Sequence, residues 1–182
     1  NPLMGIRNTL EQVQQGTNME ESLAELVDIS INESNRVMSL ALQLKDFYRP
    51  SSGTLQPLNL HDAIEDMLRL KKNDFNRSNL KLTKYYSEPF PNVNVVEDQF
   101  KQVILNLLQN ANEACPKGGE LSIRTRVLNS TVEVEIGDNG QGIPQENMEK
   151  LFDPFFTTKA EVKGTGLGLS VSYGIIQRLG GN

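Results

Sequence analysis

The character of the sequence changes at Pro50, and this change limits the possible folds more than any other feature. Residues 19–49 repeat apolar and small side chains at spacings of three, four or seven, which predicts one long helix with an apolar seam. Arg49-Pro50 ends this helix, because proline has no amide proton and restricts the residue before it. Residues 1–16 form a shorter helical pattern, so residues 1–49 are expected to fold as an antiparallel helical hairpin. The seam consists of Leu23, Leu26, Ser30, Val37, Ala41, Leu44 and Tyr48.

The apolar seam of the hairpin needs a partner that covers it. The hairpin of a second copy of the chain would cover the seam and form a dimeric four-helix bundle. The alternative is that the seam packs against the globular part of the same chain. The pattern favours the homodimer and leaves the alternative open.

Residues 50–57, PSSGTLQP, have the composition of a linker and separate the hairpin from a second domain, residues 58–182. Helical patterns and strand patterns are interleaved in this second domain. We expect helices near residues 59–77, 98–114, 146–151 and 167–179, and strands at residues 80–86, 92–96 and on both sides of Asn129-Ser130. In the last two strands Leu121 and Ile123, and then Val132, Val134 and Ile136, alternate with polar residues. Helices among mostly antiparallel strands predict an α+β fold, a two-layer sandwich.

Composition narrows the function and the compartment. The formal net charge of −5 argues against a broad electrostatic grip on nucleic acid or on an anionic membrane. Cys115 is the single cysteine, so an internal disulfide framework is excluded, which suits a reducing compartment. No apolar run is long enough to cross a bilayer, and no signal peptide opens the sequence. We therefore expect a cytoplasmic segment with no nucleic-acid partner and no direct membrane contact, either alone or as part of a membrane-bound sensor.

Two asparagines lie four residues apart on the helix expected near residues 98–114. Asn106 and Asn110 therefore share one face of that helix. Burying two amides costs free energy unless they are hydrogen-bonded or bind a ligand, and an asparagine carbonyl is a hard oxygen ligand suited to Mg²⁺. The alternative is that both side chains cap or brace a neighbouring loop, and the residues alone leave it open.

Two glycine-containing loops supply further candidate residues. DNGQGI, residues 138–143, follows a strand, where Asp138 can accept a hydrogen bond from a ligand amino group and Gly140 and Gly142 allow tight backbone geometry. Taken alone, an Asx-type turn leaving the strand is the commoner explanation. KGTGLGLS, residues 163–170, precedes a helix, so free backbone amides and the helix dipole can face a phosphate. Its spacing follows neither the dinucleotide-binding nor the P-loop pattern.

These motifs, in this order and together with LFDPFFTTK at residues 151–159, closely resemble the catalytic half of sensor histidine kinases, most of all their nitrogen-regulator branch. Such kinases belong to an ATPase superfamily that also includes gyrase, heat-shock chaperone and mismatch-repair ATPases. The resemblance covers nearly the whole chain. It implies a dimerisation and phosphoacceptor hairpin followed by an ATPase domain of this superfamily, with ATP and Mg²⁺ as its ligands.

The resemblance implies a role for each motif. Asn106 and Asn110 match the asparagine box, with Asn110 as the Mg²⁺ ligand, and Asp138 matches the aspartate that reads the adenine amino group. Lys159 is placed to approach the phosphates, and residues 157–168 match the mobile lid over ATP. The implied ATP-binding residues are Asn106, Asn110, Asp138, Gly140, Gly142, Ile143, Lys159, Gly164, Thr165, Gly166, Leu167, Gly168 and Leu169. The phenylalanine box is matched by Phe152, Phe155 and Phe156.

The resemblance also implies a phosphoacceptor that the sequence does not contain. The first hairpin helix of the family carries His-Glu-x-x-Asn-Pro-Leu, and this chain opens with Asn1-Pro2-Leu3. The phosphoacceptor histidine is therefore expected upstream of Asn1, no catalytic residue is expected within the chain, and the chain is expected to be truncated at both ends. The implied reaction transfers the γ-phosphate of ATP to that histidine and then to an aspartate of a response-regulator receiver domain.

Other activities of the same fold are the alternatives. Hydrolytic members of the superfamily have a glutamate four positions before the Mg²⁺-binding asparagine, where it activates water. Here that position is Asn106, which cannot act as a general base, so transfer to a side chain is favoured over hydrolysis. The alternatives are a non-catalytic nucleotide-binding signalling module, and a protein-serine kinase or hydrolytic ATPase on this fold.

His61 is the only histidine in the sequence. No second histidine exists to complete a metal site with it, and it lies at the start of the helix expected at residues 59–77. We therefore expect His61 to be an ordinary surface residue without a catalytic role.

Overall fold

The structure is a computed structural model that describes residues 6, 9, 23, 25–33, 37, 53–129, 131–159 and 165–182. The chain divides into two compact units. The first consists of Asn1–Arg49 and Asp153–Leu167, and the second of Pro50–Phe152 and Gly168–Asn182.

In the first unit, residues 25–33 are helical, as the apolar seam predicts. Leu23, Val27 and Ile31 are exposed apolar residues at intervals of four, so they lie along one side of this helix. The rest of the hairpin predicted at residues 1–49 lies almost entirely outside the described residues.

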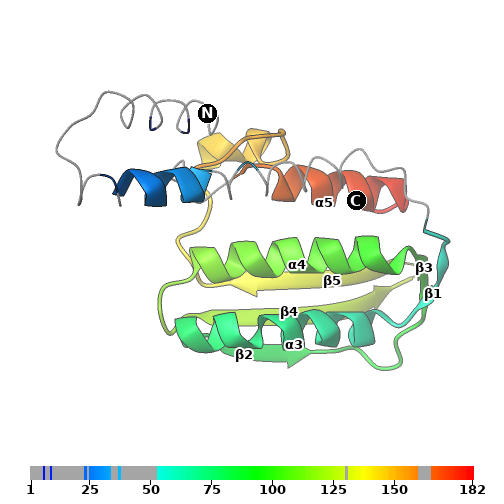
Figure 1. The fold of residues 1–182 in the computed structure, drawn as a ribbon. Helices are drawn as coiled ribbons and strands as arrows, with labels where there is room; N and C mark the ends of the chain where they lie inside the picture. The colour runs from blue at the N-terminus through cyan, green and yellow to red at the C-terminus, as the bar shows by residue number, and fades with distance from the viewer. Residues whose placement is uncertain are drawn as a thin grey trace. The chain divides into compact units, whose positions relative to one another are not determined.

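The longest helix of the second unit is α3, Leu60–Ser78 (Figure 1). Asn59 caps its start, because the Asn59 side chain accepts a hydrogen bond of 3.0 Å from the backbone N–H of His61. Asn79 ends the helix in the left-handed conformation, with a φ of 53°. The buried residues recur at helical spacing, so one stripe of the helix faces the core. They are Leu60, Ala63, Ile64, Leu68 and Phe75.

A three-stranded sheet in the order β2-β4-β5 forms the other layer of this unit. β2, Lys81–Tyr85, pairs in parallel with β4, Glu120–Leu128, and β4 pairs antiparallel with β5, Thr131–Asp138. A parallel pair needs a long crossover connection, which here includes a helix. The alternation predicted for β4 is confirmed, because Leu121 and Ile123 are only 1% and 0% exposed.

A small second sheet pairs β1, Gln56–Leu58, antiparallel with β3, Val93–Val95. β3 is the short strand expected from the sequence. β1, however, includes residues 56 and 57, which have the composition of a linker. Its partner lies far along the chain, so local composition could not reveal the pairing.

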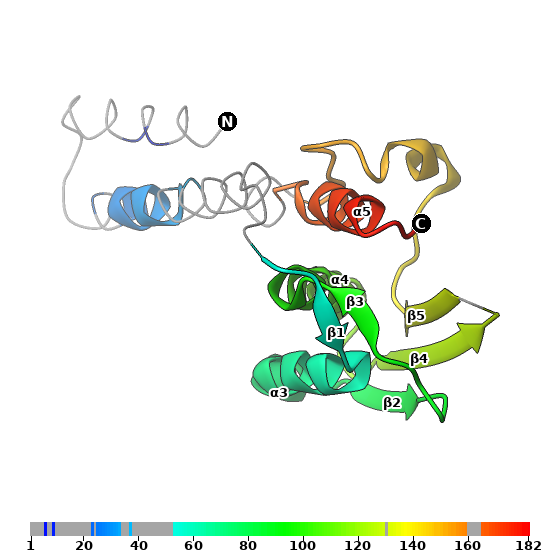
Figure 2. The ribbon, with the colours of Figure 1, turned by 90° about the vertical axis from the view of Figure 1, so that its right-hand side faces the viewer.

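Helices α3 and α4, Glu97–Ala114, lie side by side over the same face of the three-stranded sheet (Figures 1 and 2). α5, Gly168–Arg178, packs against α4, and a short 3-10 helix, Gln145–Lys150, comes between β5 and α5 in the chain. Ile64 and Leu108 are fully buried between helices and sheet. The arrangement confirms the predicted α+β fold with two layers.

The predicted surface position of His61 is wrong. The residue lies at the start of a helix as expected, but only 12% of its side chain is exposed. The imidazole lies between the rings of Tyr86 and Phe90, at centroid distances of 4.4 and 4.3 Å. Its Nε2 lies 2.9 Å from Oγ1 of Thr125. These neighbours follow β2 or belong to β4, so the sequence around His61 gave no sign of them.

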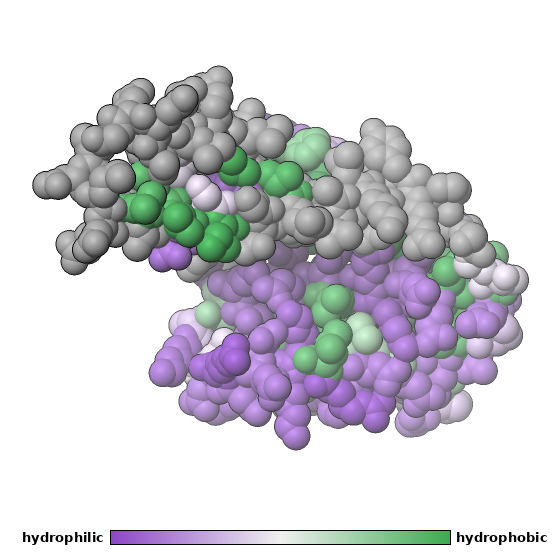
Figure 3. Space-filling view, in the orientation of Figure 1, coloured by the Kyte–Doolittle hydropathy of each residue, from purple (hydrophilic) through white to green (hydrophobic). Residues whose placement is uncertain are grey.

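Within the part of the chain that the structure describes, no helix is long and apolar enough to cross a membrane. Figure 3 shows that the surface around α3 and β2 is mostly hydrophilic. This surface is hydrophilic because α3 and β2 contain many charged residues.

Candidate functional site

The asparagine pair lies in the second half of α4. Asn106 and Asn110 are one helical turn apart, and both are half-buried. The Nδ2 atom of Asn106 donates to the carbonyl oxygen of Gly168 and to Oγ of Ser172, both at 3.2 Å. Asn106 therefore braces the first turn of the helix α5, whereas the alternative interpretation expected both asparagines to brace a neighbouring loop.

Asp138 is the last residue of β5, and its side chain is exposed. Its Oδ1 accepts a hydrogen bond of 2.9 Å from the backbone N–H of Gly140, which makes an Asx turn. A Cβ on Gly140 would lie 2.6 Å from the carbonyl oxygen of Ala114, so the loop after β5 runs directly against the end of α4. Asn110 is one helical turn from that contact.

The next residues of this loop continue at the surface. Gly142 has a φ of 71°, in the left-handed region that favours glycine. Ile143 follows it with 54% of its side chain exposed.

Asn139 and Cys115 are two residues of this region that were assigned no role in the candidate site from the sequence. Oδ1 of Asn139 accepts a hydrogen bond of 2.8 Å from the backbone N–H of Glu120, which joins the end of β5 to the start of β4. The Sγ atom of Cys115 lies 3.8 Å from the same Oδ1. Burial, and after it the nearby Asp138 carboxylate, raises the pKa of the Cys115 thiol. The Asp138-Asn139-Gly140 sequence was the only sign of this contact. It does not show with which strand Asn139 forms a hydrogen bond.

The glycine-rich segment is divided between the two units. Lys159, Thr165, Gly166 and Leu167 belong to the first unit, Gly168 and Leu169 open α5 in the second, and Gly164 lies outside the described residues. In the first unit, the backbone N–H of Phe155 donates to the carbonyl oxygen of Gly166 at 3.0 Å. A Cβ at position 166 would lie 2.3 Å from the Phe155 carbonyl carbon, so this approach requires glycine.

Lys159 closes a short turn in the same segment. Its backbone N–H donates to Oγ1 of Thr157 at 3.2 Å. In the second unit, the ring of Phe152 stacks on Tyr173 of α5, with the centroids 4.8 Å apart. The first residue of the phenylalanine box thus contacts the helix that follows the glycine-rich segment.

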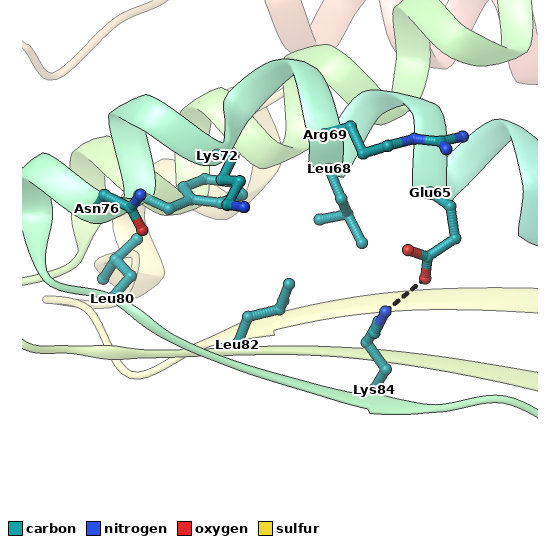
Figure 4. A pocket seen from close by; sticks show the side chains of 9 residues that line it. Glu65, Leu68, Arg69, Lys72, Asn76, Leu80, Leu82 and Lys84 are labelled. Atoms are coloured by element: carbon teal, nitrogen blue, oxygen red, sulfur yellow. Dashed lines mark hydrogen bonds and ion pairs between the residues drawn. The ribbon is translucent and has the colours of Figure 1, made fainter.

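A separate hollow of about 250 Å³ lies between α3 and β2 (Figure 4). Leu68, Leu80 and Leu82 line it, and an ion pair of 2.7 Å joins Lys84 to Glu65 across it. None of the ATP-binding residues implied by the motifs lines this hollow. It is therefore not part of the candidate site.

Comparison with known proteins decides the family. Residues 95–182 match the family of histidine kinase-, DNA gyrase B- and HSP90-like ATPases. The solved catalytic domain of the histidine kinase ThkA is 34% identical, with a TM-score of 0.63 over 68% of this chain and 80% of that one. This chain belongs to the sensor histidine kinase family. The match confirms the predicted family and supports ATP binding by this histidine kinase domain.

Curated relatives of this histidine kinase chain are longer proteins. The sensor kinase CckA of Brucella abortus is 36% identical over 177 residues, covering 89% of this chain and 18% of CckA. The sensory histidine kinase/phosphatase NtrB of Azospirillum brasilense is 32% identical over 196 residues, covering 100% of this chain and 48% of NtrB. The chain spans less than half the length of both relatives. NtrB agrees with the resemblance to the nitrogen-regulator branch.

A second solved structure of ThkA is also similar to this chain. It holds ThkA in complex with the response regulator protein TrrA, and it is 26% identical with a TM-score of 0.78. The similarity extends over 100% of this chain and 52% of that one.

Proposed function

We propose that this chain is the core of a sensor histidine kinase that binds ATP with Mg²⁺ and transfers the γ-phosphate to a hairpin histidine upstream of Asn1. The phosphate then passes to an aspartate of a response-regulator receiver domain. The observation that carries the proposal is the packing of Gly140 against Ala114, because it joins the Asp138 loop to the helix of Asn110.

Asp138 and Asn110 bind opposite ends of the nucleotide in this proposal. Oδ1 of Asp138 is engaged by the Gly140 amide, which leaves Oδ2 to accept a hydrogen bond from the adenine amino group. Asn110 would hold Mg²⁺ through its carbonyl oxygen. The described residues include no cluster of three acidic, histidine or cysteine ligands, which fits an ion that takes its other ligands from phosphates and water. Bound magnesium offsets the negative charge of the phosphates.

The same proposal gives a role to each of the remaining site residues. Gly140, Gly142 and Ile143 lie beside the base, and Lys159 supplies a positive charge to the phosphates. The amides at the start of α5 suit an anion, because the first four N–H groups of a helix have no partner within it. The phosphate-binding segment consists of Gly164, Thr165, Gly166, Leu167, Gly168 and Leu169.

Transfer rather than hydrolysis is favoured by Asn106. Its amide donates hydrogen bonds to α5 and has no proton-accepting strength, so this position supplies no general base for water. Positioning and charge neutralisation account for most of the rate of phosphoryl transfer. The bound γ-phosphate is therefore expected to react with the imidazole of the phosphoacceptor histidine rather than with water.

The first unit supports the dimer part of the proposal. Leu23, Val27, Ile29 and Ile31 are exposed apolar helical residues of this unit, and a four-helix bundle made with a second copy would cover such residues. We assign the hairpin to residues 1–49, the linker to residues 50–57 with its end in β1, and the ATP-binding domain to residues 58–182. A cytoplasmic location and a receiver-domain partner belong to the same proposal.

The full-length protein incubated with γ-labelled ATP tests this function. A label on the protein that is lost in acid and kept in base is expected, because a phosphohistidine bond is acid-labile. An acid-stable label, or free phosphate without any labelled protein, would contradict histidine phosphorylation.

The site assignment is tested by nucleotide titration of Asn110→Ala and Asp138→Ala. Both substitutions are expected to abolish measurable ATP binding. Asn73→Ala is the matched control, because Asn73 is an exposed asparagine on α3. Unchanged ATP affinity in both site variants would contradict the assignment of Asn110 and Asp138 to the ATP site.

A further inference from the structure

The side chain of Asn106 connects two helices of the second unit at one point. Its Nδ2 atom donates to two acceptors, the carbonyl oxygen of Gly168 and Oγ of Ser172, both at 3.2 Å. Gly168 is the first residue of α5, and Ser172 lies one turn further along it. A single side chain of α4 therefore holds the whole first turn of α5.

The two acceptors are themselves bonded to each other. Oγ of Ser172 donates to the carbonyl oxygen of Gly168 at 2.9 Å, and Ser172 is only 5% exposed. The Asn106 amide completes this buried cluster. Removing the Asn106 amide takes one of two side-chain donors from the Gly168 carbonyl oxygen and a donor from Oγ of Ser172, and losing hydrogen bonds from a buried cluster costs more than losing an exposed one.

The chemistry of the contact requires a donor at position 106. The Gly168 carbonyl oxygen can only accept, so a carboxylate at this position would face it with a second acceptor. Aspartate has the shape of asparagine and keeps its oxygen, yet it loses both N–H groups. An oxygen ligand for Mg²⁺ would have the opposite requirement, since a carboxylate binds Mg²⁺ at least as well as an amide oxygen.

We propose that Asn106 is a positioning residue for nucleotide binding, which acts through its N–H groups by fixing the first turn of α5. The inference rests on the proposed function, in which the N-terminal amides of α5 face the phosphates. It separates Asn106 from Asn110, because only the carbonyl oxygen of Asn110 is needed for magnesium.

The test compares ATP affinities of Asn106→Asp and Asn106→Ala with that of the wild-type chain, with Mg²⁺ and with EDTA. About a tenfold loss or more is expected at pH 8 for both variants, as follows from losing two hydrogen bonds in a half-buried cluster. The loss is expected to be the same with Mg²⁺ and with EDTA. Circular dichroism at low temperature identifies folded samples, and Asn106→Ala keeps the test open if the aspartate variant does not fold.

The pH dependence gives a readout that a merely structural role would not move. A protonated aspartic acid regains an O–H donor, so the loss in Asn106→Asp is expected to shrink as the pH falls from 8 toward 5. The loss in Asn106→Ala is expected to stay constant over the same range. Each affinity is compared with the wild type at the same pH, which removes the titration of ATP itself.

Ser172→Ala provides the coupled control. It leaves the bond from Asn106 to Gly168, so a loss of only about two- to fivefold is expected. Combined with Asn106→Ala, it is expected to add little, because both residues belong to one cluster.

Two results would overturn this inference and leave the proposed function unaffected. The first is unchanged ATP affinity in Asn106→Asp while Asp138→Ala abolishes binding. The second is a loss in Asn106→Ala that disappears in EDTA, which would make Asn106 an oxygen ligand of magnesium. Absence of ATP binding by the wild-type chain would instead overturn the proposed function, and the inference with it.

Discussion

The imidazole of His61 stacks on the phenol ring of Tyr86, with the ring centroids 4.4 Å apart and the planes inclined by 11°. Phe90 covers the other face at 4.3 Å. Oγ1 of Thr125 lies 2.9 Å from Nε2 and also accepts the backbone N–H of Ser87 at 3.0 Å. One histidine thus joins the start of α3, the segment after β2, and β4.

Replacing this histidine should destabilise the second unit without removing its site. His61→Ala is expected to lower the free energy of unfolding by about 2–4 kcal/mol, through lost ring contacts and a hydrogen bond. Urea unfolding followed by circular dichroism measures it. Lys72→Ala, at an exposed position of the same helix, is expected to change it by less than about 0.5 kcal/mol. A His61→Ala protein as stable as the wild type would contradict this role.

The packing of Gly140 against α4 predicts a steric effect on nucleotide binding. A Cβ at this position would lie 2.6 Å from the carbonyl oxygen and 2.7 Å from the carbonyl carbon of Ala114. The backbone cannot yield, so in Gly140→Ala the loop that carries Asp138 must move. About a tenfold or greater loss of ATP affinity is expected, which corresponds to 1.4 kcal/mol or more.

Gly118→Ala is the control for this prediction. Gly118 has a φ of 81°, and a Cβ there would lie 3.9 Å from its nearest neighbour, which is Nδ2 of Asn79. Only backbone strain is expected, at a stability cost of about 1 kcal/mol and with unchanged ATP affinity. Equal ATP affinities in the two glycine variants would rule out the steric explanation.

The elements with strong periodicity were predictable from the sequence. The helix expected at residues 98–114 is α4, and the alternation of Leu121 and Ile123 placed the buried face of β4 correctly. These patterns are local, because each apolar residue reports the face that its own helix or strand buries.

The features that the sequence did not reveal depend on partners distant in the chain. His61 is buried by Tyr86, Phe90 and Thr125, and β1 forms only because β3 pairs with it. The hydrogen bond from Asn106 to Gly168 spans 62 residues, so the motif could not distinguish a brace from a ligand. The order of the motifs identified the candidate site in the sequence. The contacts between its residues could be described only from the folded structure.

The buried stripe of α4 predicts a large cost for a small change. Leu108 is 0% exposed within the core, whereas Leu70 on α3 is 64% exposed. Leu108→Ala is expected to lower the free energy of unfolding by about 2–5 kcal/mol, and Leu70→Ala by less than about 0.5 kcal/mol. Denaturant unfolding measures both, and equal values would contradict the position of the core.

The thiol of Cys115 offers a chemical probe of Asp138. Burial raises the pKa of this thiol, and the negative charge of Asp138 raises it further, since both disfavour the thiolate. Only the thiolate reacts with iodoacetamide, so the wild-type protein is expected to react more slowly at pH 7.5 than a free thiol, whose pKa is about 8.5.

Asp138→Asn removes the charge and nearly preserves the shape of the side chain, so the thiol pKa is expected to fall. Alkylation at a fixed pH should then become faster, and the midpoint of the rate against pH should move to lower pH. Asp98→Asn removes an equal charge at an exposed residue in the first turn of α4 and is expected to leave the profile unchanged. Identical profiles for the wild type and Asp138→Asn would show that the Asp138 carboxylate does not act on the thiol.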